Sequence, residues 1–320
     1  AAGPGIGSTL RRPMDANRHN GGVALVTGGA RRIGRAIALA LAGDGWDVAV
    51  HFGRSAAEAA DTVRSIESIG RRAAALACDL GDSEAVRALP GRCAQVLGPL
   101  ACVVTGYGIN ADEELALAFR MAGACVRSVH AGDLVADPRF LGRFDILALP
   151  GGFSFGDHLG SGKVLAHLFR RSLRPALEEF VASGGLVIGI CNGFQVLVKM
   201  GLLPNLASRW EPEVSLVHNA SGVFEDRWVR VAFDPESPCV WTRGLSAMDV
   251  PVRHGEGRFV ATDGRLLAEL EAAHLAAARY VPRDGGPLPA PYPNNPNGSV
   301  NDIAGITDRT GRVFGLMPHP

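Results

Sequence analysis

The sequence has no long hydrophobic segment, no excess of charge of one sign and no closely spaced pair of cysteines. Its longest apolar runs, such as Ala36–Ala42 and Leu186–Ile190, are far shorter than the roughly 20 residues that cross a bilayer. Lys and Arg together number 32, as do Asp and Glu, so no net field attracts nucleic acid or an anionic membrane. The 6 cysteines form no CxxC pair, which argues against a zinc site and favours reduced thiols. We therefore expect a cytoplasmic protein without a membrane span, a nucleic-acid partner or a metal.

The length and the two ends of the chain suggest how it is organised. A chain of 320 residues with 47% hydrophobic and 20% charged residues has room for about two globular domains. Residues 1–22 are rich in Gly, Pro and Arg without periodicity, so we expect a disordered segment there. The chain begins at Ala1 rather than at Met and stops at Pro320, inside a motif described below. These features predict a piece of a longer reading frame.

The first hundred residues alternate predicted strands and helices around a glycine-rich turn. A short apolar strand ends at Thr27, Gly28-Gly29 follows at once, and Ile33–Leu41 has the apolar stripe of a helix. Small residues at such a turn let the backbone approach a pyrophosphate, and the helix N-terminus attracts its charge. An α/β half-domain that binds nothing is the alternative. The alternation continues with a strand, a helix, a strand and a helix at Asp47–Phe52, Ser55–Ile69, Ala73–Cys78 and Ser83–Leu97.

The turn resembles the cofactor loop of short-chain dehydrogenases/reductases, with Arg32 in place of the usual middle glycine, as in the pteridine-reductase-like branch. For residues 23–100 the resemblance implies a truncated Rossmann half-domain that binds NADP(H) weakly, with Arg54 and Ser55 on the 2′-phosphate. The implied cofactor-binding residues are Gly28, Arg32, Ile33, Gly34, Arg54, Ser55, Asp79 and Leu80.

The chemistry of that family needs a Tyr with a Lys four positions further on. This chain offers no such pair, because its tyrosines at 107, 280 and 292 are followed at that distance by Ala111, Asp284 and Pro296. The resemblance fades near Leu100, before any catalytic group. We therefore expect no reductase activity.

A second glycine turn, later in the chain, carries a cysteine. An apolar strand runs into Gly189-Ile-Cys-Asn-Gly193, and a helical pattern follows. Glycines on both sides of a nucleophile permit a sharp turn that exposes its side chain. The helix N-terminus then favours the thiolate, so we expect the pKa of Cys191 to lie below the value of about 8.5 for a free cysteine. A buried structural cysteine is the alternative.

Two further motifs would complete a catalytic site around Cys191. The apolar strand Phe144–Leu149 runs into Pro150-Gly151-Gly152, a turn whose backbone N–H groups can hold an oxyanion. An ordinary strand-end turn is the alternative. Near the chain end, a hydrophobic strand leads to His319, placed as the base of a Cys-His pair would be.

Two other segments can be mistaken for sites. His254 and Glu256 could form an acid/base pair or a metal site, but we expect them to serve in packing or in a subunit contact. The segment Gly160–Val164 hints at a P-loop. Asp157 stands where the first glycine is required and Val164 replaces the hydroxyl that binds Mg²⁺, so we expect no ATP site there.

Together these motifs resemble class I glutamine amidotransferases over about residues 101–320. Several segments are similar to the amidotransferase of phosphoribosylformylglycinamidine synthase in particular: Gly106–Glu114, Phe153–Asp157, His218–Phe224, His254–Phe259 and Pro293–Ser299. The resemblance implies an open, mostly parallel, flavodoxin-like α/β sheet, with Cys191 at the carboxyl end of a strand. The predicted fold class is therefore α/β, with two such sheets in one chain.

The resemblance also implies a reaction without a cofactor. Cys191 would attack the side-chain amide of glutamine to form a thioester, with His319 as base. The backbone N–H groups of Gly152 and Asn192 would bind the oxyanion, while Gly151 and Gln195 would help to shape the glutamine pocket. The ammonia would pass to a separate ATP-dependent formylglycinamidine synthetase subunit in purine synthesis.

The end of the chain and the join between its parts leave alternatives open. In the family a Glu follows the His-Pro pair and orients the imidazole. Because the sequence stops at Pro320, we expect an impaired glutaminase. The strand at Cys102–Thr105 fits both resemblances, which indicates a chimeric or mis-joined chain, or a natural fusion. A non-catalytic NADP-binding fragment and an inert chimera are the competing hypotheses.

Overall fold

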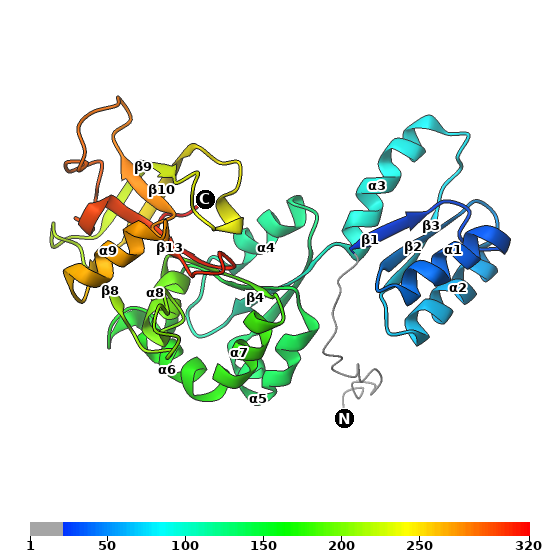
Figure 1. Cartoon of the computed structure of the whole chain (residues 1–320), viewed down its shortest axis with the longest axis horizontal. Helices are drawn as coiled ribbons and strands as arrows, with labels where there is room; N and C mark the ends of the chain where they lie inside the picture. The colour runs from blue at the N-terminus through cyan, green and yellow to red at the C-terminus, as the bar shows by residue number, and fades with distance from the viewer. Residues whose placement is uncertain (1–21) are drawn as a thin grey trace, which may run out of the picture. The chain divides into compact units, whose positions relative to one another are not determined.

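The computed structural model of the chain describes residues 22–320 in two compact units (Figure 1). The first unit runs up to Gly98 and takes in Gly123–Cys125, and the second holds Pro99–Ala122 and Val126–Pro320. Residues 1–21, and with them nearly all of the predicted disordered segment, lie outside the described part. Within residues 22–320, no helix is long and apolar enough to cross a bilayer.

The first unit is a small parallel sheet with helices on both faces. Its three strands lie in the order β1-β2-β3, and both pairings are parallel. The strands and helices alternate as the sequence predicts, with ends that differ by a few residues at most. The elements are β1 (Val23–Val26), α1 (Arg32–Gly43), β2 (Asp47–Phe52), α2 (Ala56–Ser68), β3 (Ala73–Ala77) and α3 (Ser83–Leu97).

Side-chain alternation along β2 divides this unit into two apolar layers. Val48 and Val50 point into one layer, which α1 and α2 cover. Ala49 points into the other, which α3 covers with Leu89 and Cys93. The three β2 residues are fully buried, as expected for a strand in the middle of a parallel sheet.

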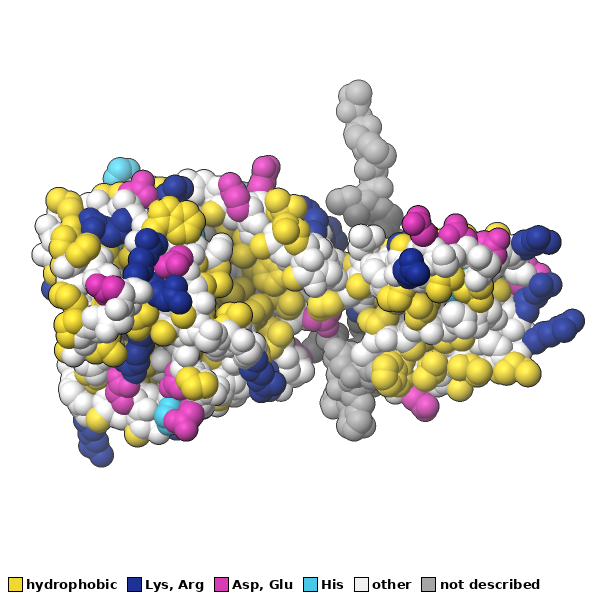
Figure 2. Space-filling model, turned by 90° about the horizontal axis from the view of Figure 1, so that it is seen from above, with side chains coloured by type: hydrophobic (Ala, Val, Ile, Leu, Met, Phe, Trp, Pro, Cys, Tyr) yellow, Lys and Arg dark blue, Asp and Glu magenta, His cyan; other side chains and the backbone are white. Residues whose placement is uncertain are grey.

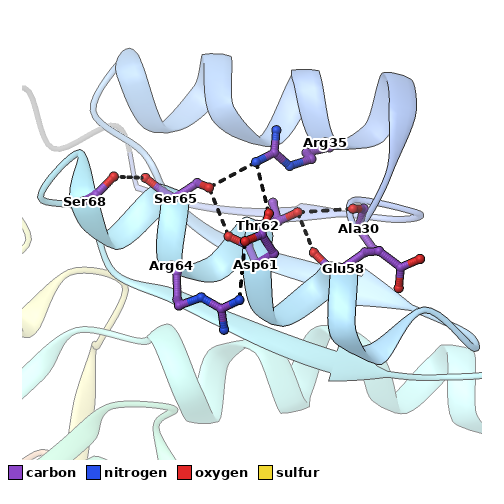
Figure 3. Close-up of polar contacts among 8 residues, drawn as sticks. All are labelled: Ala30, Arg35, Glu58, Asp61, Thr62, Arg64, Ser65 and Ser68. Carbon is purple, nitrogen blue, oxygen red and sulfur yellow. Dashed lines mark hydrogen bonds and ion pairs between the residues drawn. The ribbon is translucent and has the colours of Figure 1, made fainter.

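Polar contacts hold α1, α2 and the glycine turn together (Figure 3). Arg35 of α1 donates to the Ser65 hydroxyl at 3.1 Å and lies 3.4 Å from the Asp61 carboxylate. The buried Thr62 hydroxyl of α2 donates to the Ala30 carbonyl at 3.2 Å. Since Ala30 belongs to the turn between β1 and α1, this last bond fixes the turn against α2.

The second unit is built on a mixed sheet of nine strands in the order β10-β9-β12-β13-β14-β7-β6-β4-β5, with a separate pair, β8 and β11. Its first elements are β4 (Leu100–Thr105), α4 (Asp112–Met121), β5 (Cys125–His130), α5 (Ala131–Ala136), η1 (Pro138–Arg143), β6 (Ile146–Leu149), η2 (Ser154–Asp157), α6 (Lys163–Ser172), α7 (Arg174–Ala182), β7 (Leu186–Ile190) and α8 (Asn192–Met200). The remaining ones are β8 (Val214–His218), β9 (Glu225–Phe233), η3 (Val240–Thr242), β10 (Ala247–His254), β11 (Glu256–Ala261), α9 (Gly264–Ala272), β12 (Ala278–Val281), η4 (Val300–Asp302), β13 (Ile303–Thr307) and β14 (Val313–Leu316).

The parallel part of this sheet, β14-β7-β6-β4, positions the carboxyl ends of its strands along one edge. Helix α4 covers one face, where Val103, Ala116 and Ala148 form an apolar cluster. Helices α6, α7 and α8 contribute to the large core on the other face, together with Leu147 and Leu149. The predicted α/β fold class is confirmed. The antiparallel strands β9, β10, β12 and β13 were not predicted, and β14 ends at Leu316, three residues before His319.

The surface carries charges of both signs. On the face drawn in Figure 2, basic and acidic side chains are interspersed. Many charged side chains of the described residues are paired; for example, Arg230 and Arg283 lie 3.2 and 3.1 Å from the Asp249 carboxylate. Exposed pairs of this kind contribute about 0–1 kcal/mol each, so they matter more for solubility than for stability.

Candidate active site

The turn between β7 and α8 has the strained geometry expected of a nucleophile elbow. Cys191 adopts φ 50° and ψ −106°, a backbone conformation that costs on the order of 1–3 kcal/mol for a residue with a side chain. A Cβ on Gly193 would lie 2.0 Å from the Leu149 carbonyl oxygen. Only glycine therefore lets the first turn of α8 approach β6 closely enough to place Cys191 at the end of β7.

His319 lies beside the elbow because the residues after β14 continue toward β10, where Figure 1 marks the end of the chain. Its backbone N–H donates to the Pro251 carbonyl at 2.9 Å. A Cβ on Gly151 would lie 2.7 Å from the His319 ring and 3.5 Å from the Cys191 Cβ. The structure thus brings Cys191, His319 and Gly151 together, and the missing side chain at 151 leaves room for the imidazole.

The expected low pKa of Cys191 is wrong for this resting site. Burial raises the pKa of the thiol to about 12, the Asn192 backbone N–H lowers it and the Asp157 carboxylate raises it further. The Cys191 side chain is almost completely buried, so the loss of hydration outweighs one helix N-terminus. Burial, with a contribution from Arg253, lowers the pKa of His319. The pair is therefore a neutral thiol and a neutral imidazole at neutral pH.

The two side chains are not hydrogen-bonded to each other in this state. The Cys191 Sγ donates to the Arg253 carbonyl at 3.8 Å. The His319 Nε2 is buried and has no hydrogen-bond partner among the described residues. Catalytic hydrogen bonds are often long or misaligned without substrate, so this arrangement fits a resting enzyme.

The predicted oxyanion turn follows β6 and is held by its carbonyl. The Gly151 carbonyl accepts from the backbone N–H groups of Asn110 and Ala111, both at 3.3 Å. Gly152 has φ 147°, and a Cβ there would lie 2.8 Å from the Gly108 carbonyl oxygen. Both glycines are therefore required by close approach, and the turn lies next to the elbow.

The side chains of Asn192 and Gln195 tie this wall of the site together. Asn192 is fully buried, accepts from the Ser154 backbone N–H at 3.2 Å and donates to the Gln195 amide oxygen at 2.9 Å. The Gln195 amide nitrogen donates to the Glu256 carbonyl. Gln195 thus fixes the position of this wall, and both groups of its amide are already hydrogen-bonded; its predicted role in glutamine binding stays a prediction.

The segment that hints at a P-loop contacts carboxylates. The backbone N–H of Ser161 donates to Glu256 at 3.2 Å, and that of Gly162 donates to Asp157 at 3.2 Å. The Lys199 ammonium lies 3.5 Å from the same Glu256 carboxylate. Carboxylates therefore already take these backbone N–H groups, and Glu256 links the segment to Lys199 of α8.

The carboxyl end of β10 forms another wall of the site, and the sequence analysis did not assign it there. Its Arg253 and Pro251 carbonyls accept from the Cys191 thiol and the His319 backbone. His254 is buried at the end of the same strand, on the inner face with Val250 and Val252. That alternation of apolar residues up to His254 is the signal in the sequence that would have placed its ring inside.

Three segments that resemble the synthase family are far apart in the sequence but bonded to one another. The Asn219 backbone N–H donates to the Gly255 carbonyl at 2.9 Å, and that of Ala220 donates to the Asn297 carbonyl at 2.9 Å. The buried Asn297 amide donates to the Gly257 carbonyl at 2.8 Å. The polar residues of these motifs therefore build one buried network behind the end of β10.

The predicted cofactor residues of the first unit lie along one edge of its sheet. Gly28, Arg32, Ile33 and Gly34 follow β1, Arg54 and Ser55 follow β2, and Asp79 and Leu80 follow β3. A Cβ on Gly34 would lie 2.1 Å from the Gly28 carbonyl oxygen, so glycine is required there. The Gly28 backbone N–H donates to His51 Nδ1 at 3.1 Å. All of the predicted residues therefore lie at the carboxyl ends of three adjacent strands, and one N–H group of the turn is already hydrogen-bonded.

One cluster that the sequence analysis missed combines a histidine with two carboxylates. Ligand atoms of Asp234, Glu236 and His274 lie within 4.8 Å of one another. The His274 Nδ1 is 2.9 Å from Asp234, and its Nε2 is 3.4 Å from Glu236. Because both ring nitrogens face carboxylates, the geometry suits a protonated imidazole, whereas a metal would take one nitrogen.

Comparison with known proteins agrees with both parts of the chain. Residues 98–320 match the family described as CobB/CobQ-like glutamine amidotransferase domain, and residues 22–121 match short chain dehydrogenase. Both predicted resemblances are confirmed. The two matches overlap at residues 98–121, which contain β4, the strand that fits both sequences.

Curated relatives and a solved structure make the assignment more specific. The phosphoribosylformylglycinamidine synthase subunit PurQ of Methanococcus maripaludis is 43% identical over 223 residues, covering 69% of this chain and 81% of the relative. The PurQ subunit of Dehalococcoides mccartyi is 45% identical over 214 residues, covering 67% and 81%. The structure of PurLQS from Thermotoga maritima aligns with a TM-score of 0.52 at 32% identity, covering 69% of this chain and 87% of that one. The chain therefore belongs to the glutamine amidotransferase family of the PurQ subunits.

Proposed function

We propose that this chain hydrolyses glutamine at Cys191 and supplies the ammonia to an ATP-dependent synthetase subunit that makes formylglycinamidine ribonucleotide. The observation that carries the proposal is the elbow: Cys191 stands on a strained turn at the end of β7, with the His319 ring packed against Gly151 beside it. The relatives that share this part of the chain are PurQ subunits of phosphoribosylformylglycinamidine synthase. A cytoplasmic location stays a prediction.

The neutral pair defines the first half of the reaction. His319 takes the thiol proton while the Cys191 sulfur bonds to the amide carbon of glutamine. The carbonyl oxygen becomes an oxyanion, which the backbone N–H groups of Gly152 and Asn192 stabilise. When this intermediate collapses, the C–N bond breaks, His319 gives its proton to the leaving nitrogen, and ammonia departs from a glutamyl thioester.

Water completes the cycle. His319 accepts a proton from the water that attacks the thioester carbon, the C–S bond breaks, and glutamate leaves with the thiol restored. The lowered pKa of His319 helps here, because a neutral imidazole can accept a proton throughout the neutral range.

The test compares nitrogen sources for a synthetase subunit that has no amidotransferase of its own. With ammonium salts as the nitrogen source, the synthetase should form product without this chain. With glutamine as the source, it should form product only when this chain is present. Glutamate release measured in the same samples should rise when the synthetase is added. A synthetase that uses ammonium but gains nothing from this chain and glutamine would sink the proposal.

A second function is supported by the arrangement of the first unit. We propose that residues 23–100 bind NADPH weakly, with Arg54 and Ser55 at the end of β2 on the 2′-phosphate, and that they reduce nothing. In support, the predicted residues follow three adjacent parallel strands. Fluorescence titration should give tighter binding of NADPH than of NADH. Preference for NADH, or turnover of a pterin or carbonyl substrate, would contradict this proposal.

A further inference from the structure

His254 is a buried histidine beside the catalytic pair, and the mechanism above does not use it. Only 3% of its surface is exposed. The carbonyl of the preceding residue, Arg253, accepts a hydrogen bond from the Cys191 thiol. The Pro251 carbonyl of the same strand accepts from the His319 backbone N–H. The charge of a protonated His319 would also lower the pKa of His254, which puts the two rings within electrostatic reach of each other.

The hydrogen bonds around Asn219 determine which nitrogen of His254 carries the proton. The Asn219 amide nitrogen donates to the carbonyls of His254 and Val223, at 2.7 and 2.9 Å. Its oxygen accepts from the Gly257 backbone N–H at 3.2 Å, so the orientation of the amide is fixed. That same oxygen lies 3.1 Å from His254 Nδ1. Because an amide oxygen can only accept, Nδ1 carries the hydrogen.

The His254 ring is neutral in the working range of pH. Burial, and then the charge of His319, lower its pKa to about 4. Glu225 is its cross-strand neighbour, but the carboxylate of Glu225 lies 2.6 Å from the Arg227 guanidinium. With Nδ1 protonated and the ring neutral, Nε2 has a free lone pair and acts as a hydrogen-bond acceptor.

This acceptor has no partner among residues 22–320, although it is buried. Buried polar atoms are nearly always satisfied, so an orphaned one on the strand end that contacts both Cys191 and His319 points to a ligand. The side-chain amide of glutamine brings an N–H₂ donor to Cys191, whereas the side-chain carboxylate of glutamate brings only acceptors and a negative charge. We infer that His254 Nε2 accepts a hydrogen bond from the amide nitrogen of glutamine, and that this contact selects glutamine over the product glutamate.

The inference rests on the proposed function and names a specificity residue for it. A site built to hydrogen-bond a substrate N–H rejects the analogue that lacks it, because the polar group of the site is then left unpaired. Here the rejected analogue is the product, so the same contact would promote release of glutamate after each turnover. His254 then holds the scissile amide nitrogen in place while His319 moves the protons.

Equilibrium binding to the full chain with Cys191→Ala tests the inference without turnover. Calorimetric titration should show glutamine binding at least about 100-fold more tightly than glutamate. Adding His254→Phe, which keeps a ring but removes the acceptor, should reduce this ratio at least about tenfold. His254→Gln, whose amide oxygen can accept near the same place, should retain most of it. Because both ligands are titrated into the same variant, a partly unfolded fraction cancels from the ratio.

Asn219→Asp provides a second test in case the His254→Phe variant does not fold. It should reverse the preference rather than only weaken it. A carboxylate facing Nδ1 favours the protonated ring, so Nε2 becomes a donor and the preference should shift toward glutamate. If the ratio of glutamine to glutamate affinity is unchanged in His254→Phe, or in Asn219→Asp, the inference is wrong. The proposal that Cys191 hydrolyses glutamine would still stand. Failure of the Cys191→Ala chain to bind glutamine at all would instead overturn the proposed function as well.

Discussion

Two strand–turn–helix junctions of this chain share two backbone features and have different chemistry. In the turn from β1 to α1, Arg32 adopts φ 50°, and in the turn from β7 to α8, Cys191 also adopts φ 50°. Each junction depends on a glycine whose added Cβ would lie about as close to a carbonyl oxygen, at 2.1 Å for Gly34 and 2.0 Å for Gly193. Both junctions thus combine a residue at positive φ with a glycine that close packing requires.

What differs is how deeply each junction is enclosed. β7 lies between β14 and β6, whereas β1 is at the edge of the described three-stranded sheet. In α8 all side chains except that of Lys199 are buried, whereas in α1 only Ala38 and Ala42 are. Because the β7–α8 junction is enclosed, Cys191 is shielded from water, and its thiol can lose a proton only to His319. The open junction leaves the backbone of its turn and its arginines exposed to solvent.

The largest predicted effect is on glutamate release, and it distinguishes the nucleophile Cys191 from the other buried cysteines. Cys191→Ala should reduce glutamate release by on the order of 10³-fold or more, because no other group can form the thioester. Cys239→Ala should leave the rate within a few-fold, although Cys239 is fully buried too. Steady-state glutamate release from the two variants checks this, and equal rates would show that the elbow does not hold the nucleophile.

Next in size are the two glycines that make the junctions possible. Gly193→Ala should cut glutaminase activity about 100-fold, because a shift of the elbow by ~1 Å misplaces the sulfur. Gly34→Ala should leave that rate unchanged and destabilise only the first unit, by about 1–3 kcal/mol. Kinetics combined with thermal unfolding distinguishes the two. A glutaminase loss in Gly34→Ala as large as in Gly193→Ala would mean that the junctions are not independent.

The features that the sequence predicted well are local. The glycine turns, the parallel strands before them and the positions of Cys191 and Gly151 all follow from a few consecutive residues. The antiparallel strands could not be predicted in this way, since β12 pairs with β9 and β13 across long separations in sequence. Which ring nitrogen of His254 carries the proton likewise depends on Asn219, 35 positions earlier.

The direction of the Cys191 pKa shift also could not be read from its motif. The motif supplies the helix N-terminus, which favours a thiolate, and the Asn192 backbone N–H does lower the pKa. Burial is a property of the surrounding sheet and helices, and it has the larger effect. A local pattern therefore identifies the nucleophile but does not give its protonation state.

The raised pKa of Cys191 makes a third prediction, on reactivity. At pH 7.5 a thiol with a pKa of about 12 is almost entirely protonated, so iodoacetamide should alkylate Cys191 at least about tenfold more slowly than the partly exposed Cys125. Peptide mapping by mass spectrometry gives both rates in one sample. Raising the pH should accelerate the Cys191 reaction through the alkaline range. Faster labelling of Cys191 than of Cys125 at neutral pH would restore the original expectation of a resting thiolate.

The smallest effect concerns the half-buried His274, whose pKa is shifted in the opposite direction to that of His319. Burial lowers the pKa of His319, whereas at the surface the hydrogen bond that His274 donates to Asp234, followed by the charges of the carboxylates, raises the pKa of His274. A raised pKa means that the folded state holds the proton more tightly, so the stabilisation is fully present below the unfolded value of about 6.5 and is lost as the pH rises through the folded value. His274→Gln should therefore lower the unfolding temperature modestly at pH 5.5 and hardly at all at pH 9. Added salt should shrink the difference, since exposed charges are screened. Asp234→Asn is the matched control and should show the same dependence on pH. A difference that persists at pH 9, or an unfolding temperature that rises with added zinc, would show that the cluster does not act through a protonated imidazole.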